Sequence, residues 1–122
     1  MSGHILTVDD SMSIRQAIKL TLSGANFKVD EAENGAEGLK KAEVGAYDLI
    51  LTDLNMPVMN GLEMIQEIRR RGVLVGVPIV FLTTESDATL KEQAKAAGAT
   101  GWLTKPFLPD QLLRVVGKVL GQ

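Results

Sequence analysis

Cysteine is absent from this chain of 122 residues, and His4 is the one histidine. The lack of cysteine excludes disulfides, thiol catalysis, zinc ribbons and iron–sulfur clusters. A single histidine leaves little for a Ser-His-Asp triad or a multi-histidine metal site. No apolar run approaches the about 18–20 residues that cross a bilayer, and the N-terminus lacks the basic and apolar regions of a secretory signal. We therefore expect a cytoplasmic domain without membrane insertion, whose chemistry comes from Asp, Glu, Lys and hydroxyl side chains.

The charge balance is close to neutral, because 13 basic and 15 acidic side chains give a formal charge of −2. This mild acidity argues against nucleic acid as the main partner, since phosphate backbones are bound by basic surfaces. Hydrophobic residues make up 45% of the chain and charged residues 23%, which is a globular composition. The length predicts one domain, since domains mostly contain about 100–200 residues.

Short apolar runs alternate with segments in which apolar residues recur at helical spacing. The apolar runs predict strands at residues 5–8, 27–32, 47–52, 78–82 and 100–104. The amphipathic segments predict helices at residues 12–24, 35–44, 62–71 and 88–97 and around 112–119. This alternation is typical of an α/β fold in which helices cover both faces of an open parallel sheet. Right-handed crossovers restrict such a sheet to doubly wound forms.

Polar side chains follow four of the five predicted strands. Asp9 and Asp10 follow the first strand, Asp53 the third, Thr83 the fourth and Lys105 the fifth. Ligands of doubly wound sheets bind at the carboxyl ends of the strands, near the point where the strand order reverses. If the first and third strands are neighbours, three carboxylates meet there with a hydroxyl and an ammonium group nearby.

Three ionised carboxylates in one crevice repel one another, since one pair at ~4 Å costs roughly 4 kcal/mol at an effective dielectric of about 20. With Lys105 they leave a local charge of −2, which a divalent cation would neutralise. Oxygen ligands favour Mg²⁺, Mn²⁺ or Ca²⁺ over zinc. Mg²⁺ commonly binds carboxylates together with a phosphate oxygen, and a carboxylate can itself accept a phosphoryl group. The alternative is structural, because Asp10 or Ser11 could cap the helix at 12–24.

Several short segments at these strand ends occur together and in order. They are Val8-Asp9-Asp10-Ser11, Leu51-Thr52-Asp53-Leu54-Asn55-Met56-Pro57, Met59-Asn60-Gly61, Leu82-Thr83-Thr84-Glu85, Gly101-Trp102 and Lys105-Pro106-Phe107. In them the chain resembles the response-regulator receiver domains, in particular the single-domain chemotaxis regulators of the CheY type. The resemblance covers essentially the whole chain. It implies a flavodoxin-like sheet with strand order 2-1-3-4-5, and one receiver domain over residues 1–122 without an output domain.

The resemblance also implies roles for the acidic residues. Asp53 would be the phosphoacceptor, taking a phosphoryl group from a histidine kinase or from a small donor such as acetyl phosphate. Asp9, Asp10 and Asp53 would hold Mg²⁺, with Asp10 as a direct ligand and Asp9 acting largely through water. The backbone carbonyl of Asn55 would complete the protein's share of the ligands.

A second group of residues is implied to transmit and time the signal. Thr83 would hydrogen-bond the phosphoryl group, and Lys105, in a cis peptide with Pro106, would pair with it. Trp102 stands where the family carries the aromatic that turns inward behind the moving hydroxyl, although Trp is bulkier than the Tyr or Phe of many members. Asn55 and Glu85 would tune self-dephosphorylation.

The implied function is a phosphorylation-activated switch of a two-component system of the chemotaxis type. Such a protein is no enzyme beyond catalysing its own phosphorylation and dephosphorylation. Its partners would be a histidine kinase, a downstream target such as the flagellar motor switch, and a phosphatase. Phosphorylation would change the surface of the fourth helix, fifth strand and fifth helix, where partners bind.

Three other functions remain open from the residues. A phosphate sink or a phosphorelay intermediate would use the same site with other partners. A phosphohydrolase of the haloacid dehalogenase type requires Asp-x-Asp after the first strand, where this chain has Asp9-Asp10-Ser11. A flavodoxin-like FMN binder requires a loop rich in glycine and hydroxyl groups at that position, where two carboxylates would repel the phosphate.

Overall fold

A five-stranded parallel sheet forms the centre of the computed structural model, which describes residues 2–54, 56–83 and 88–122. The strands are β1 (Gly3–Val8), β2 (Phe27–Ala32), β3 (Leu49–Asp53), β4 (Ile79–Thr83) and β5 (Gly101–Thr104). The helices are α1 (Met12–Ser23), α2 (Gly35–Val44), α3 (Gly61–Arg71), α4 (Ala88–Ala96) and α5 (Pro109–Leu120). The strands pair in parallel in the order β2-β1-β3-β4-β5, so the predicted doubly wound fold and its strand order are confirmed.

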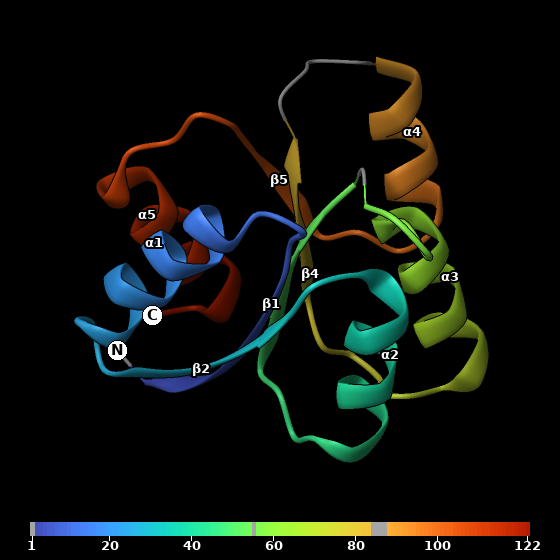
Figure 1. Ribbon diagram of the computed structural model, residues 1–122, viewed down its shortest axis with the longest axis horizontal. Coiled ribbons are helices and arrows are strands. Elements are labelled where there is room, and N and C mark those ends of the chain that lie inside the picture. The colour runs from blue at the N-terminus through green and yellow to red at the C-terminus, as the bar shows by residue number, and fades with distance from the viewer. Residues whose placement is uncertain (1, 55, 84–87) are drawn as a thin grey trace.

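Helices cover both faces of the sheet (Figure 1). Helices α1 and α5 lie on one side, and α2, α3 and α4 lie on the other. A strand covered on both faces carries mostly apolar side chains, and Leu49, Ile50 and Leu51 of β3 are all fully buried. Leu49 and Leu51 belong to the core under α1 and α5, whereas Ile50 belongs to the core under α2 and α3.

Side-chain hydrogen bonds cap the first turns of α1 and α3 at the carboxyl edge of the sheet. Ser11 Oγ accepts a hydrogen bond from the Ile14 N–H at 3.3 Å at the start of α1. Asn60 and Glu63 form a reciprocal capping box at the start of α3, which satisfies two backbone donors that the first turn leaves unpaired. Among the described residues, no helix combines the length and apolar character needed to cross a membrane.

Four strands have boundaries that differ from the prediction; β1 starts two residues earlier and β5 one residue later than predicted, while β3 and β4 also end one residue later, at the carboxyl edge. The pattern predicts the third strand at 47–52, but β3 runs from Leu49 to Asp53. The fourth strand, predicted at 78–82, runs from Ile79 to Thr83. Asp53 and Thr83 are therefore the last residues of their strands rather than loop residues, with Asp53 opposite Leu82 in the β3–β4 register. The sheet ladder fixes their backbone positions.

Candidate functional site

Three carboxylates meet at the carboxyl edge of β1 and β3. These two strands are neighbours, and the strand order reverses between them, which is the position at which doubly wound sheets bind ligands. Asp9, Asp10 and Asp53 each offer one carboxylate oxygen within 4.8 Å of the others'. The structure therefore brings together the three carboxylates that the sequence predicts to meet. We refer to Asp9, Asp10 and Asp53 as the acidic cluster.

Asp9 is the buried member of the acidic cluster, with none of its surface exposed. Its Oδ1 atom accepts a hydrogen bond from the Ser11 N–H at 2.9 Å, and its Oδ2 atom lies 2.7 Å from Lys105 Nζ. Asp10, the next residue, is exposed. Both Asp9 oxygens thus have protein partners, whereas the Asp10 carboxylate faces solvent. This difference favours Asp10 as a direct cation ligand and an indirect role for Asp9.

Asp53 is partly buried, with 13% of its side chain exposed. Its Oδ1 atom accepts a hydrogen bond from the Leu54 N–H at 2.8 Å, and its Oδ2 atom lies 3.4 Å from Lys105 Nζ. Burial raises the pKa of Asp53; the Lys105 charge opposes this rise and the Asp9 charge adds to it, and the net pKa lies above the ordinary value. Ionised Asp53 is therefore disfavoured here, and a cation beside it would offset that cost.

Lys105 is the cation that the fold supplies to the acidic cluster. Its side chain is 9% exposed and forms ion pairs with both Asp9 and Asp53. Its backbone N–H donates to the Thr83 carbonyl at 2.6 Å, so the end of β4 holds the segment that carries the lysine. The predicted cis peptide between Lys105 and Pro106 is confirmed. Thr83 itself is buried, with 7% of its surface exposed.

The donor chemistry of the acidic cluster fits a hard divalent cation. All the donors are oxygens, one carboxylate is exposed, and three carboxylates with one lysine leave a charge of −2. Mg²⁺ prefers this kind of partial, oxygen-only site because it retains several of its waters. The competing interpretation is that Asp10 or Ser11 caps α1, and in the structure the Ser11 hydroxyl is the cap. Asp10 is therefore not needed as the N-cap of that helix.

Of the remaining predicted site residues, the structure describes Trp102 but not Asn55 or Glu85. Asn55 and Glu85, expected to tune dephosphorylation and, for Asn55, to contribute a carbonyl ligand, lie outside the described residues. Trp102 lies on β5 with 41% of its surface exposed. It lines two hollows between β5 and α5, of about 400 Å³ and about 350 Å³. Its inward rotation stays a prediction, and in this structure the indole is partly open to solvent.

Sequence reasoning missed Arg15. This arginine is buried, with 7% of its surface exposed, and its guanidinium contacts the backbone of Asp9. A signal was present, because Arg15 shares the buried face of α1 with Ile18 and Leu22, at helical spacings of three and seven residues. A charged residue within an apolar stripe indicates a buried polar partner.

The strand order, and the acidic cluster with one lysine at the switch point, agree with the receiver domains that the sequence resembles. The sequence model described as "Response regulator receiver domain" matches residues 5–117. The chain belongs to this family, and hence to the receiver domains of two-component response regulators.

Single-domain and larger regulators are both among its relatives. It is 38% identical to chemotaxis protein CheY1 of Helicobacter pylori, over 96% of each chain. The structure of Vibrio cholerae CheY4 superposes with a TM-score of 0.93 at 44% identity, over 98% of this chain and 100% of that one. The receiver domain of sensor histidine kinase PA1611 from Pseudomonas aeruginosa, solved with magnesium in its active site cleft, superposes over the full length of both chains with a TM-score of 0.90 at 30% identity. The chain also spans 47% and 48% of the length of matching transcriptional regulatory proteins, about half of each.

Proposed function

We propose that this protein is a phosphorylation-activated signalling switch in which Asp53 accepts a phosphoryl group from a histidine kinase in a Mg²⁺-dependent reaction. The observation that carries the proposal is the arrangement around Asp53. Its Oδ2 atom lies within the acidic cluster and 3.4 Å from Lys105 Nζ, at the exposed edge of the sheet. Structural neighbours at this fold include a receiver domain with magnesium in its active site cleft.

Transfer requires an oriented nucleophile and compensation of negative charge more than it requires acid–base groups. The Leu54 N–H holds Asp53 Oδ1, so that Oδ2 is the oxygen available for attack. Attack of this oxygen on phosphorus forms the O–P bond as the P–N bond of the phosphohistidine breaks, and the departing imidazole takes up a proton. A bound Mg²⁺, held by Asp10 and Asp53 and through water by Asp9, would supply positive charge to the phosphoryl oxygens.

Lys105 and Thr83 are proposed to bind the phosphoryl group of the acyl phosphate product. An acyl phosphate carries a charge of roughly −2, against −1 for the carboxylate. Lys105 Nζ already lies between Asp9 and Asp53, so the added charge draws it toward the phosphoryl group. The Thr83 hydroxyl, at the end of the neighbouring strand, would bind a phosphoryl oxygen. A contact made only in the phosphorylated state is what allows phosphorylation to shift a conformational equilibrium.

The output is proposed to be a changed surface on α4, β5 and α5. Trp102 lies on β5, three residues before Lys105, and the Lys105 backbone is bonded to Thr83. Movement of Thr83 and Lys105 is therefore coupled to β5, and the partly exposed Trp102 would turn inward.

The proposed partners are a chemotaxis-type histidine kinase, a downstream protein such as the flagellar motor switch, and a phosphatase. In this proposal the protein acts in the cytoplasm and catalyses only its own phosphorylation and dephosphorylation.

A phosphate sink or a phosphorelay intermediate is the alternative that uses the same site, and the identity of the partner separates these roles. A haloacid dehalogenase type of hydrolase is disfavoured, because Ser11 stands where that class needs its second aspartate and its hydroxyl caps α1. An FMN site is disfavoured because Asp9 and Asp10 occupy the position of the phosphate loop.

The test is phosphate release from acetyl phosphate by the wild type and by Asp53→Asn, with Mg²⁺ and with EDTA. Turnover detects an acyl phosphate that is too short-lived for mass analysis. Release that requires both Mg²⁺ and Asp53 supports the proposal. If both proteins release phosphate at the background rate, the same comparison is made with a phosphorylated histidine kinase, and failure to label Asp53 there contradicts it. Asp110→Asn, an exposed carboxylate on α5, is the matched control and should behave as the wild type.

A further inference from the structure

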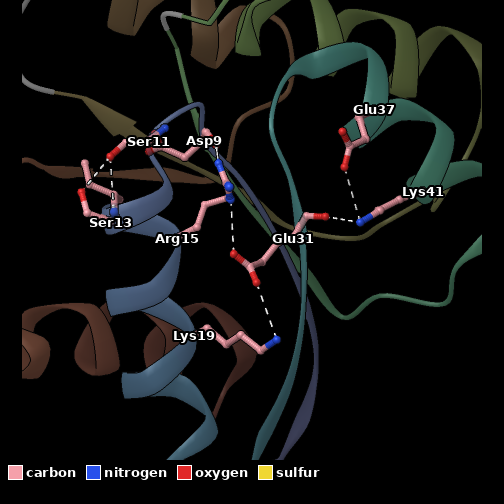
Figure 2. Close-up of polar contacts among 9 residues, drawn as sticks. Asp9, Ser11, Ser13, Arg15, Lys19, Glu31, Glu37 and Lys41 are labelled. Atoms are coloured by element: carbon pink, nitrogen blue, oxygen red, sulfur yellow. Dashed lines mark hydrogen bonds and ion pairs between the residues drawn. The ribbon is translucent and has the colours of Figure 1, made fainter.

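Arg15 connects the acidic cluster to β2. Its Nη1 atom donates a hydrogen bond to the backbone carbonyl of Asp9 at 2.6 Å, and its Nε atom donates to Glu31 Oε1 at 3.2 Å (Figure 2). Glu31 lies on β2 and also forms an ion pair with Lys19 of α1 at 3.6 Å. The Arg15 side chain is 8% exposed and that of Glu31 is 29% exposed. The guanidinium is thus a buried bridge between the β1–α1 turn and the edge strand.

The bridge completes the anchoring of Asp9. The Asp9 N–H donates to the Ala32 carbonyl at 3.0 Å, and its carboxylate is held by the Ser11 N–H and by Lys105. The carbonyl oxygen is the last polar group of the residue, and Arg15 occupies it. A guanidinium suits this task because its rigid fork can serve the carboxylate of Glu31 and the carbonyl of Asp9 at once.

The orientation of the Asp9 carbonyl determines the position of the Asp10 backbone. The peptide unit is planar, so its six atoms, from Cα of Asp9 to Cα of Asp10, move as one body. Fixing the Asp9 oxygen therefore fixes the plane that leads into the exposed Asp10. Without the guanidinium, the plane could rotate and the Asp10 carboxylate would no longer be held near those of Asp9 and Asp53.

We propose that Arg15, anchored by Glu31, is a positioning residue of the acidic cluster, and that it raises the affinity of the cluster for a divalent cation by fixing the Asp9–Asp10 peptide. The inference rests on the proposed function, because it concerns the cation site of that function. Arg15 does not touch the cation or Asp53; it acts through the backbone of Asp9.

Positioning and charge predict opposite results, which makes the inference testable. Arg15 carries a positive charge close to an anionic site, so removing that charge strengthens cation binding if electrostatics alone operates. Removing the bridge weakens cation binding if positioning dominates. Outer partners of metal ligands commonly contribute about 10-fold to 100-fold in affinity. We expect Arg15→Met to weaken binding by about 10-fold, at the lower end of this range.

The experiment is a Mn²⁺ titration of the full chain, in which electron paramagnetic resonance measures free Mn²⁺. Lys19→Met is the matched control. It removes one positive charge from the same helix and one contact to Glu31, but it leaves the Asp9 carbonyl bonded to Arg15. The wild type and Lys19→Met should bind Mn²⁺ within about two-fold of each other, while Arg15→Met binds about 10-fold more weakly. Thermal unfolding curves identify a temperature at which every variant is folded.

Arg15→Lys is the second variant, and it covers the case in which Arg15→Met does not fold. It preserves the charge, so a loss of Mn²⁺ affinity in this variant arises from the lost bridge. Affinity equal to or higher than that of the wild type in Arg15→Met, or in Arg15→Lys where Arg15→Met does not fold, overturns the inference and leaves the proposed function intact. An equal loss in Arg15→Met and Lys19→Met overturns it as well. Absence of Mn²⁺ binding in the wild type contradicts the metal-dependent function and the inference together.

Discussion

Lys105 Nζ lies closer to Asp9 than to Asp53, at 2.7 Å against 3.4 Å, although 96 positions separate Lys105 from Asp9 in the chain. Asp9 is fully buried and Lys105 nearly so, so each charge depends on the other for compensation. Asp53 shares the lysine as its second partner. The relationship has consequences for stability, for pH dependence and for the signalling role.

Removing Lys105 should destabilise the fold strongly, because it leaves the buried Asp9 carboxylate without its ionic partner. Breaking one side of a buried pair costs about 3–5 kcal/mol. We expect Lys105→Met to lower the free energy of unfolding, measured in urea without Mg²⁺, by about 3 kcal/mol. The double variant Asp9→Asn/Lys105→Met should recover much of that loss, since no unpaired charge is then buried. Lys118→Met, on the exposed face of α5, is the control.

Asp53→Asn should stabilise the metal-free protein near neutral pH. Burial and the Asp9 charge hold the pKa of Asp53 above its ordinary value despite Lys105. A carboxyl whose pKa is raised on folding favours the fold below its unfolded pKa and disfavours it once the pH rises through the folded pKa. Asparagine carries no such cost, so its advantage should appear near pH 7 and disappear in acid. Unfolding curves in EDTA over this pH range provide the measurement; a variant less stable than the wild type at pH 7 would falsify the electrostatic account.

Tyr47, two residues before β3, and Asp30 of β2 form a second pair, separate from the acidic cluster. Burial and the hydrogen bond from the Tyr47 hydroxyl to Asp30 Oδ2, 2.8 Å long, raise the pKa of Tyr47 to about 12. Tyr47 is the single tyrosine of the chain, so tyrosinate absorbance reports it alone. Asp30→Asn should lower this pKa toward the ordinary value of about 10, because the neighbouring negative charge disappears. The control is Asp48→Asn, and circular dichroism at each pH verifies that the fold persists.

The same pair predicts an acid-sensitive contribution to stability. Burial by itself would raise the pKa of Asp30. The Tyr47 hydroxyl and His4 lower this pKa by more than burial raises it, so the net pKa lies below the ordinary value. A carboxyl with a depressed folded pKa stabilises the protein above its unfolded pKa, and this stabilisation is lost as the pH falls through the folded pKa. Tyr47→Phe should therefore destabilise the protein at pH 7 by about 1 kcal/mol, the usual size of a hydrogen bond. Its effect should shrink in acid; an unchanged effect there would contradict this assignment.

Gly61 touches the backbone of Asp53, which gives the Met59-Asn60-Gly61 segment a structural reason. A Cβ atom at Gly61 would lie 2.1 Å from the Asp53 carbonyl oxygen, so either α3 or the end of β3 would have to move. We expect Gly61→Ala to lower the free energy of unfolding by about 1–3 kcal/mol, the range of overpacked sites. It should also slow phosphate release from acetyl phosphate. Gly101→Ala is the matched control, because a Cβ atom there meets no atom within 4 Å; equal behaviour of the two variants would argue against the contact.

The sequence by itself predicted the α/β class, the alternation of strands and helices, and the polar residues at the strand ends. These features depend on local periodicity, which the chain displays regardless of what packs against it. Even β3 was predicted two residues too early at its start, because Tyr47 is apolar enough to extend the strand pattern while its hydroxyl bonds to Asp30. The strand order came from the family resemblance, since periodicity does not specify neighbours.

Only the tertiary structure determined which residues contact one another. It placed Lys105 Nζ closer to Asp9 than to Asp53, buried Arg15 against the Asp9 carbonyl, and packed Gly61 against the Asp53 backbone. Each of these contacts joins residues from different elements, so it depends on the register and spacing of packed strands and helices rather than on any pattern along the chain. A residue's periodicity indicates the face on which it lies, whereas its partner is decided by what the rest of the fold brings to that face.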